Sequence, residues 1–418
     1  MRFLFTFMIA IFILAGCTGV TMQLAGLALP WSVPGVAQAV TLPSPTPGII
    51  PTDAPIMEAQ ATQVPTQAAT STPRPTPTAK PFVYAYGPYF FPPEINPLTG
   101  LPVEDNALLE RRPIVIKVTN FPRSVRPQQG LSQADHVYEY YIGDSMSRFI
   151  GVFYGRDASS VGPIRSARLF DEHVMRMYKG IFVFGWADDP ILEFLLAPDI
   201  KNFLVVERPG NCPPLCRAEP MGTYNNLFVD TSQIGPYLER RGTNNERQNL
   251  NGLRFELAVP KSGNPGESFF LQYSIVSYHS WEYDPESERY LRYQETDDAP
   301  YGVEKQYAPL TDNLTGNQLG ADNVVVLRVP HDYFMKSNST EILDQPVIGS
   351  GTGYAFRNGF VYPVIWSLEN SEQLFRLFLP NGISYPLKPG TVWYEIIGET
   401  SGFYLGVNGS YEFDFSIP

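Results

Sequence analysis

The sequence predicts an α+β protein in which a mixed α/β N-terminal domain is followed by a β-rich C-terminal domain. Apolar runs of strand length are interspersed with short amphipathic segments in the first half, whereas the second half is almost wholly strand and turn patterns. The chain's 24 Tyr and 27 Phe accompany 34 Gly and 40 Pro, a mixture typical of strands joined by tight turns. Its 418 residues suffice for about two or three domains.

The N-terminus carries an export signal. Arg2 precedes a charge-free, predominantly apolar run over residues 3–15, and residues 14–17 read Leu-Ala-Gly-Cys. This ending resembles the lipobox of bacterial lipoproteins, in which a lipid is attached to the cysteine. We therefore expect residues 1–16 to be a signal peptide and Cys17 to be lipidated. The protein would then be held by the lipid bilayer at the outer face of the bacterial cytoplasmic membrane.

Two other interpretations of this region stay open. Ala37-Gln38-Ala39 fits an ordinary signal-peptidase site, and cleavage after Ala39 would release the protein. The apolar region also continues past Cys17 without a charge, which is compatible with an uncleaved anchor. All three interpretations place the folded body outside the cytoplasm.

Residues 17–81 are predicted to form a disordered tether. From residue 41 onward this segment is rich in Pro and Thr. Proline removes backbone donors and fixes φ, so the segment can be neither a helix nor a central strand.

The first folded domain is expected over residues 82–262. Its predicted strands are Ile114–Thr119, Val137–Ile142, Phe149–Tyr154 and Ile181–Trp186, and its predicted helices are Asp171–Lys179, Pro190–Ala197 and Ser232–Arg240.

A turn-rich break over residues 262–266 separates it from a β-rich domain over residues 266–418. The predicted strands of that domain are Phe269–His279, Val324–Val329, Phe360–Trp366, Phe375–Leu379 and Val392–Ile397. Asn358-Gly359 and Asn381-Gly382 predict hairpin turns.

After Cys17, Cys212 and Cys216 are the remaining cysteines. A pair this close in an oxidising compartment predicts a disulfide. Free thiols and a redox or metal role stay open as alternatives, although two thiols without a nearby histidine do not make a zinc site.

Charge is unevenly distributed. The chain carries a net charge of −12, which argues against a nucleic-acid partner. Residues 111–180 nevertheless hold eleven Arg and Lys against six Asp and Glu. Because arginine pairs bidentately with phosphate and carboxylate, this island predicts an anion site. Its centre is the stretch Gly162–Arg168. The expected ligand-binding residues are Arg126, Arg148, Arg165, Ser166 and Arg168, with Asp135 and Glu139 nearby.

A structural role for the same arginines is the alternative, in which they pair with Asp135, Glu139 and Asp157 and fix loops. Asp135, Glu139, Asp144 and Asp157 also have the oxygen ligands that a Mg²⁺ ion beside a bound phosphate would need. The histidines His136, His173, His279 and His331 lack metal-pair spacing, and neither a Gly-x-Ser-x-Gly elbow nor a Walker loop is present. We therefore expect no catalytic residue, no metal and no cofactor.

Several motifs together resemble one family. They are Asn96-Pro97-Leu98-Thr99-Gly100, Arg112-Pro113, Arg126-Pro127-Gln128-Gln129-Gly130 up to Asp135, Glu139, Arg148-Phe149, and Gly162-Pro163-Ile164-Arg165-Ser166-Ala167-Arg168. In this set the sequence is similar to the YerB-like bacterial lipoproteins, whose domain is of unknown function. Residues 323–326 and 382–393 resemble the C-terminal domain of that family. The resemblance covers residues 94–398 and implies a lipoprotein signal, a linker, a mixed α/β domain and a β-rich domain.

The resemblance supplies no activity and therefore no catalytic residue. A local departure lies at residues 143–147, where the family usually has a Gly-rich turn and this chain reads Gly-Asp-Ser-Met-Ser. The sequence favours a binding module for an anionic envelope ligand, such as a wall polymer or a lipid-linked phosphate. A metal-dependent phosphotransferase and a protein-interaction scaffold at the cell surface are the alternatives.

Overall fold

The computed structural model describes residues 85–219, 224–337, 340–406 and 409–417. The expected signal peptide, Cys17 and the tether up to residue 81 lie outside these described residues. None of the described helices is long and apolar enough to cross a membrane.

The prediction of a mixed α/β first domain is wrong, because the protein is β-rich. Strands account for 40% of the structure and helices for 13%. The α-helices of the described residues are α1 (Leu169–Tyr178), α2 (Asp189–Leu195) and α3 (Ile234–Arg241). They begin and end close to where the sequence predicts helices, but the longest has only 10 residues. They are too short to form a helical layer of the kind that defines an α/β domain.

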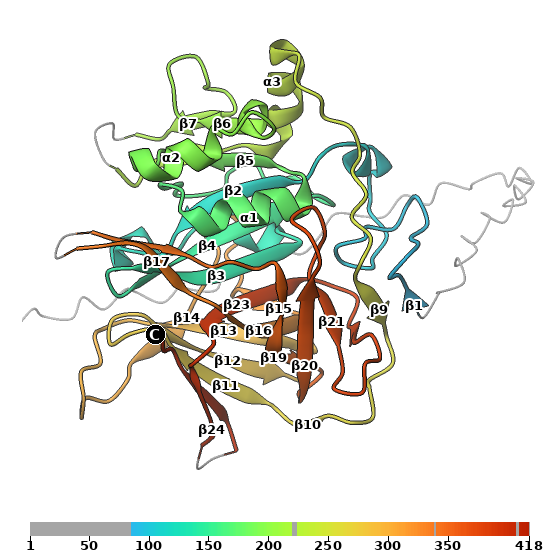
Figure 1. Ribbon diagram of the computed structural model, residues 1–418, viewed down its shortest axis with the longest axis vertical. Helices are drawn as coiled ribbons and strands as arrows, with labels where there is room; N and C mark the ends of the chain where they lie inside the picture. The colour runs from blue at the N-terminus through green and yellow to red at the C-terminus, as the bar shows by residue number, and fades with distance from the viewer. Residues whose placement is uncertain (1–84, 220–223, 338–339, 407–408, 418) are drawn as a thin grey trace, which may run out of the picture. The chain divides into compact units, whose positions relative to one another are not determined.

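An eleven-stranded sheet runs through both halves of the chain (Figure 1). In spatial order its strands are β10 (Asn264–Pro265), β20 (Phe360–Leu368), β19 (Gly349–Arg357), β16 (Asn323–Val329), β23 (Val392–Gly398), β3 (His136–Gly143), β4 (Met146–Phe153), β2 (Ile114–Thr119), β5 (Ile181–Phe184) and β6 (Leu204–Val206), with β21 (Arg376–Phe378) paired to β20. The halves meet where β23 pairs in parallel with β3 and Trp393 lies opposite Val137. The break expected at residues 262–266 is thus spanned by a shared sheet.

A seven-stranded sheet comes from the second half alone. Its order is β14 (Tyr307–Pro309), β13 (Arg289–Glu295), β12 (Tyr278–Asp284), β11 (Ser268–Gln272), β25 (Tyr411–Asp414) and β24 (Gly402–Leu405), with β15 (Gly320–Ala321) paired to β13. There are three smaller sheets among the described residues. One has three strands, β1 (Ala85–Tyr86), β9 (Arg254–Glu256) and β22 (Pro386–Leu387). The other two are the pairs β17 (Asp332–Lys336) with β18 (Glu341–Asp344), and β7 (Leu215–Arg217) with β8 (Leu227–Val229).

Apolar side chains cover both faces of the eleven-stranded sheet. Along β2, Val115 belongs to a core shared with Val174 of α1 and Ile191 of α2. Ile116 points the other way, into a core shared with Trp281 of the seven-stranded sheet. Successive strand residues face opposite sides, so a strand buried on both sides is apolar at most positions. This explains the apolar run of β5 and that of β2, which only Lys117 and Thr119 interrupt.

The turn between β19 and β20 confirms a prediction from sequence. Asn358 and Gly359 both have positive φ, at 52° and 75°. A two-residue turn of this kind needs left-handed backbone at both positions, which Asn and Gly adopt most readily.

Candidate functional site

Three arginines of the sequence island gather at the N-terminal end of α1, which lies across β2 and β4 in Figure 1. Arg148 comes from β4 and faces the same side as Ile150, toward the helices. Its Nη1 donates to the Ser166 carbonyl oxygen at 2.6 Å. Arg165 and Arg168 belong to the segment that leads into α1, and the backbone N–H of Arg165 reaches the Lys117 carbonyl on β2 at 3.4 Å.

None of these three arginines forms a salt bridge within the described part of the chain. Their hydrogen bonds go to backbone carbonyls, of Ser166 for Arg148, of Tyr224 for Arg165 and of Ala167 for Arg168. Arg148 is only 8% exposed, and Arg165 Nε is buried without a partner. A buried guanidinium is normally paired with an acid, so buried Arg148 and the half-buried Arg165 and Arg168 have unused binding capacity.

A buried ion pair forms the base of this arginine cluster, by which we mean Arg148, Arg165 and Arg168. Lys117 Nζ lies 2.9 Å from Asp171 Oδ1, which also accepts a hydrogen bond from the Tyr140 hydroxyl at 2.6 Å. The other oxygen of Asp171 accepts the backbone N–H of Arg168 at 2.7 Å and so helps to start the helix. When all of these groups are charged, Lys117 and the three arginines carry four positive charges and Asp171 carries one negative charge. The surplus is therefore three positive charges.

Burial, together with the surplus positive charge, lowers the pKa values of Lys117, Arg148 and Arg165. Burial lowers the pKa of Lys117 to about 7; Asp171 opposes this, whereas Arg148 and Arg168 add to it. Burial also lowers the pKa of Arg148 to about 9, and repulsion from Arg168 and Arg165 contributes. For Arg165, burial and then Arg168 lower the pKa. A bound anion would relieve this repulsion and favour the charged forms.

Arg126, Asp135 and Glu139 do not join the cluster. Arg126 Nη2 pairs with Glu295 Oε1 at 2.7 Å. Asp135 is buried and accepts the backbone N–H groups of Tyr154 at 2.6 Å and Gly155 at 2.9 Å. These contacts hold the protein's own backbone rather than a ligand.

Glu139 belongs to a second buried cluster, which lies between the two large sheets. Arg292 of β13 forms salt bridges with Glu139 of β3 and with Glu395 of β23. Its Nη1 lies 2.9 Å from Glu395 Oε1. His279 Nε2 lies 3.1 Å from Glu395 Oε1. Burial raises the pKa of Glu395, an effect that Arg292 opposes. The sequence did not reveal this network because its members are far apart along the chain.

Glu139, His279 and Glu395 have the ligand types for a metal ion, with atoms within 4.8 Å of one another. However, the guanidinium of Arg292 already contacts both carboxylates and balances part of their charge. The arrangement is that of a buried ion network that joins the sheets.

The two other acids considered as Mg²⁺ ligands lie apart from this network. Asp144 is exposed at the turn between β3 and β4, and Asp157 pairs with Arg111 at 2.8 Å.

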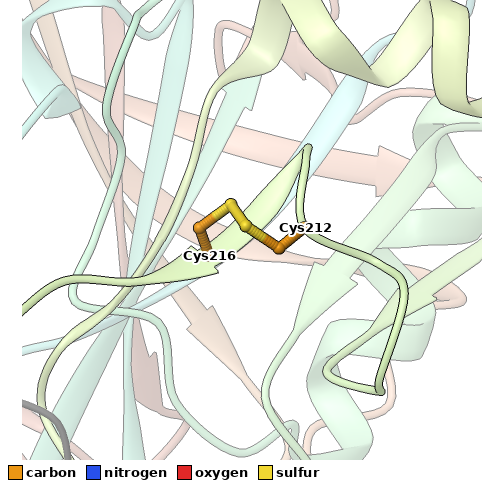
Figure 2. The surroundings of a disulfide bond; sticks show 2 residues. All are labelled: Cys212 and Cys216. Atoms are coloured by element: carbon orange, nitrogen blue, oxygen red, sulfur yellow. A yellow bond between two sulfur atoms is a disulfide. The ribbon is translucent and has the colours of Figure 1, made fainter.

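Cys212 and Cys216 form a disulfide in the structure, with Cα atoms 4.8 Å apart (Figure 2). The bond closes the loop that leads into β7, and the backbone N–H of Leu215 within that loop donates to the Asn211 carbonyl.

Comparison with known proteins places this fold in a family. Residues 98–244 match the "protein of unknown function (DUF3048) N-terminal domain", and residues 269–394 match the corresponding C-terminal domain. The chain is 26% identical over 312 residues to the "Putative lipoprotein YerB" of Bacillus subtilis (strain 168), which covers 72% of this chain and 85% of that protein. The crystal structure of the B. subtilis YerB protein shares the fold, with a TM-score of 0.61 and 24% identity, over 72% of this chain and 96% of that one. The resemblance seen in the motifs is thereby confirmed, and the chain belongs to the YerB-like (DUF3048) family.

Proposed function

We propose that this protein is an extracytoplasmic lipoprotein that binds an anionic group through Arg148, Arg165 and Arg168, with the Ser166 hydroxyl as a further donor. The lipoprotein assignment is supported by the Leu-Ala-Gly-Cys sequence at residues 14–17 and by the name of the B. subtilis relative, which calls that protein a lipoprotein. Lipidation at Cys17 would hold the folded part at the outer face of the cytoplasmic membrane.

The observation that carries the binding role is the lack of an acidic partner for the three arginines. Removing a guanidinium from water costs several kcal/mol unless an opposite charge compensates for it. Arg148 is nearly buried and is surrounded by further positive charge, yet its only hydrogen bond to a described residue is to a carbonyl oxygen. An anion placed between the arginines would supply the missing compensation. Phosphate and carboxylate groups fit best because guanidinium pairs with them through two parallel hydrogen bonds.

The direct test is a thermal-shift titration of the full chain with pyrophosphate, inorganic phosphate and sulfate. We expect pyrophosphate to stabilise the wild type, by about 2.7 kcal/mol at one hundred times its Kd. In the Arg165→Gln/Arg168→Gln variant the affinity should fall by about a hundredfold or more, since two hydrogen bonds to charged groups are lost and each contributes about 1.5–3 kcal/mol.

Arg156→Gln is the matched control because Arg156 is exposed and lies outside the cluster. It removes one positive charge and should leave the titration almost unchanged. Equal stabilisation of the wild type and the double variant, or an equal loss in the control, would contradict the proposal.

A further inference from the structure

We propose that a polar groove at the opposite end of α1 binds an oligosaccharide. Two cavities, of 420 and 210 Å³, share Lys179 and Glu372 in their walls and therefore adjoin, and we call the pair the groove. Lys179 directly follows α1, whereas Arg168 directly precedes it. A helix of 10 residues is about 15 Å long, so the groove is separate from the arginine cluster and its proposed ligand is independent of it.

The larger cavity has an unusual density of amide side chains, namely those of Asn249, Asn251, Asn370 and Gln373. Asn249 Oδ1 accepts the backbone N–H of Asn251 at 3.0 Å, and Asn370 Oδ1 accepts that of Glu372 at 3.0 Å. Each asparagine is therefore fixed through one atom. In the described part of the chain, Nδ2 of both Asn249 and Asn370 has no hydrogen-bond partner.

Asn251 is held through its Nδ2 atom rather than through its Oδ1 atom. Its Nδ2 donates to the Tyr89 carbonyl at 2.7 Å, which leaves its Oδ1 without a partner among the described residues. The groove thus presents fixed donors and a fixed acceptor side by side. Sugar hydroxyls both donate and accept, and amides are the neutral side chains that can meet both needs. Groups held in place before binding lose little entropy when a ligand arrives.

Tyr89 adds an aromatic surface to the same cavity. It is 78% exposed, yet its backbone is tied to Asn251 and its hydroxyl lies 3.5 Å from Arg376 Nη2. An aromatic ring packs against the C–H face of a pyranose, while the amides contact the hydroxyls at the edge of the sugar. An exposed ring beside fixed amides is therefore suited to a carbohydrate.

The charges of the groove are mixed, which distinguishes it from the arginine cluster. Lys179 Nζ donates to the Asn249 carbonyl at 2.9 Å, and burial lowers the pKa of Lys179, an effect that Glu372 opposes. Arg376 pairs with Glu369 at 3.3 Å. The wall thus combines acidic Glu372 with basic Lys179 and Arg376, and this mixture of charges beside neutral amides favours a hydroxyl-rich ligand over a phosphate.

The backbone of Lys179 supports a functional role for this end of α1. It adopts the left-handed conformation with φ of 49°, a position that glycine usually takes at a helix C-terminus. A lysine here costs about 1 kcal/mol or more of backbone strain. The strained residue lines both cavities, and its Nζ donates to the Asn249 carbonyl.

The test is isothermal titration of the full chain with three soluble tetrasaccharides, chitotetraose, cellotetraose and maltotetraose, beside a pentaglutamate peptide. We expect at least one tetrasaccharide to bind with a saturable signal. Tyr89→Ala should lower that affinity at least tenfold. Asn370→Asp, which keeps the acceptor for Glu372 but loses the Nδ2 donor, should lower it by about two- to tenfold.

Phe90→Ala is the control, because Phe90 is 72% exposed in the same turn but does not line the groove. It should bind like the wild type, and the unfolding temperature of each variant reports whether the fold is kept. The inference is overturned if none of the tetrasaccharides binds, if only pentaglutamate binds, or if Tyr89→Ala binds sugar as well as the wild type.

Discussion

At the scale of single residues, the arginine cluster shows what a sequence motif can and cannot reveal. The stretch from Gly162 to Arg168 placed Arg165, Ser166 and Arg168 together because they are neighbours in the chain. Lys117 was not foreseen, since it sits inside an apolar strand whose partners are invisible to local reasoning. Glu139 was expected near the arginines, but strand alternation turns it to the side opposite Tyr140. Its partner Arg292 lies 153 residues away.

Lys117 should make stability depend on pH. Its pKa is about 7 in the folded protein and near the ordinary value of 10.5 when unfolded. Between pH 7 and 10 the unfolded state binds more protons, so the free energy of unfolding gains up to about 1.4 kcal/mol per pH unit from this group. Below pH 7 both states are protonated, and the unfavourable contribution is constant.

The measurement is urea unfolding of wild type and Lys117→Met from pH 6 to 9.5. The difference in unfolding free energy should shift in favour of the wild type as the pH rises above 7. If this difference stays constant up to pH 9.5, Lys117 has an ordinary pKa and the charge surplus at the cluster is smaller than inferred here.

At the scale of elements, local patterns located the helices but not the architecture. The acids Asp171 and Glu172 in the first turn and Lys179 near the end predict a helix over Asp171–Lys179, and the structure has it at Leu169–Tyr178. The same reasoning could not reveal that the strands around it continue into strands of the second half. Periodicity identifies a strand, whereas pairing between β3 and β23 depends on residues more than 200 positions apart. The mixed α/β description therefore failed although its helices were correctly placed.

Asp171 connects the start of α1 to the sheet, and its charge should be important for stability. Asp171→Asn keeps the size of the side chain but leaves buried Lys117 without an opposite charge. Removal of one member of a buried ion pair costs about 3–5 kcal/mol. Urea unfolding at pH 6, where Lys117 is charged, should show this loss.

Glu172→Gln is the control in the same helical turn. Glu172 pairs with Arg176 four residues on, and such partly exposed helix pairs contribute about 0.3–0.5 kcal/mol. Comparable losses in the two variants would mean that the buried pair adds no more than a surface pair does.

At the scale of the whole molecule, both halves contribute to one sheet and to the ion network of Glu139, Arg292 and Glu395. The sequence boundary near residues 262–266 marks a change of composition but does not separate two independent sheets. The arginine cluster lies wholly in the first half, whereas the oligosaccharide groove draws Glu372 and Arg376 from the second.

A further group of arginines, Arg208, Arg240 and Arg241, lines a separate cavity of 360 Å³. Those three are exposed, so water already screens their charge.

Whether the arginine cluster binds an anion is best tested by locating every bound anion on the protein in one experiment. Crystals of the protein would be soaked in selenate at the concentration that half-saturates the protein in solution, and the anomalous scattering of selenium would locate each bound ion. We expect the strongest peak between the guanidinium groups of Arg148, Arg165 and Arg168. A strongest peak at Arg208, Arg240 and Arg241, or no peak at the end of α1, would contradict this expectation.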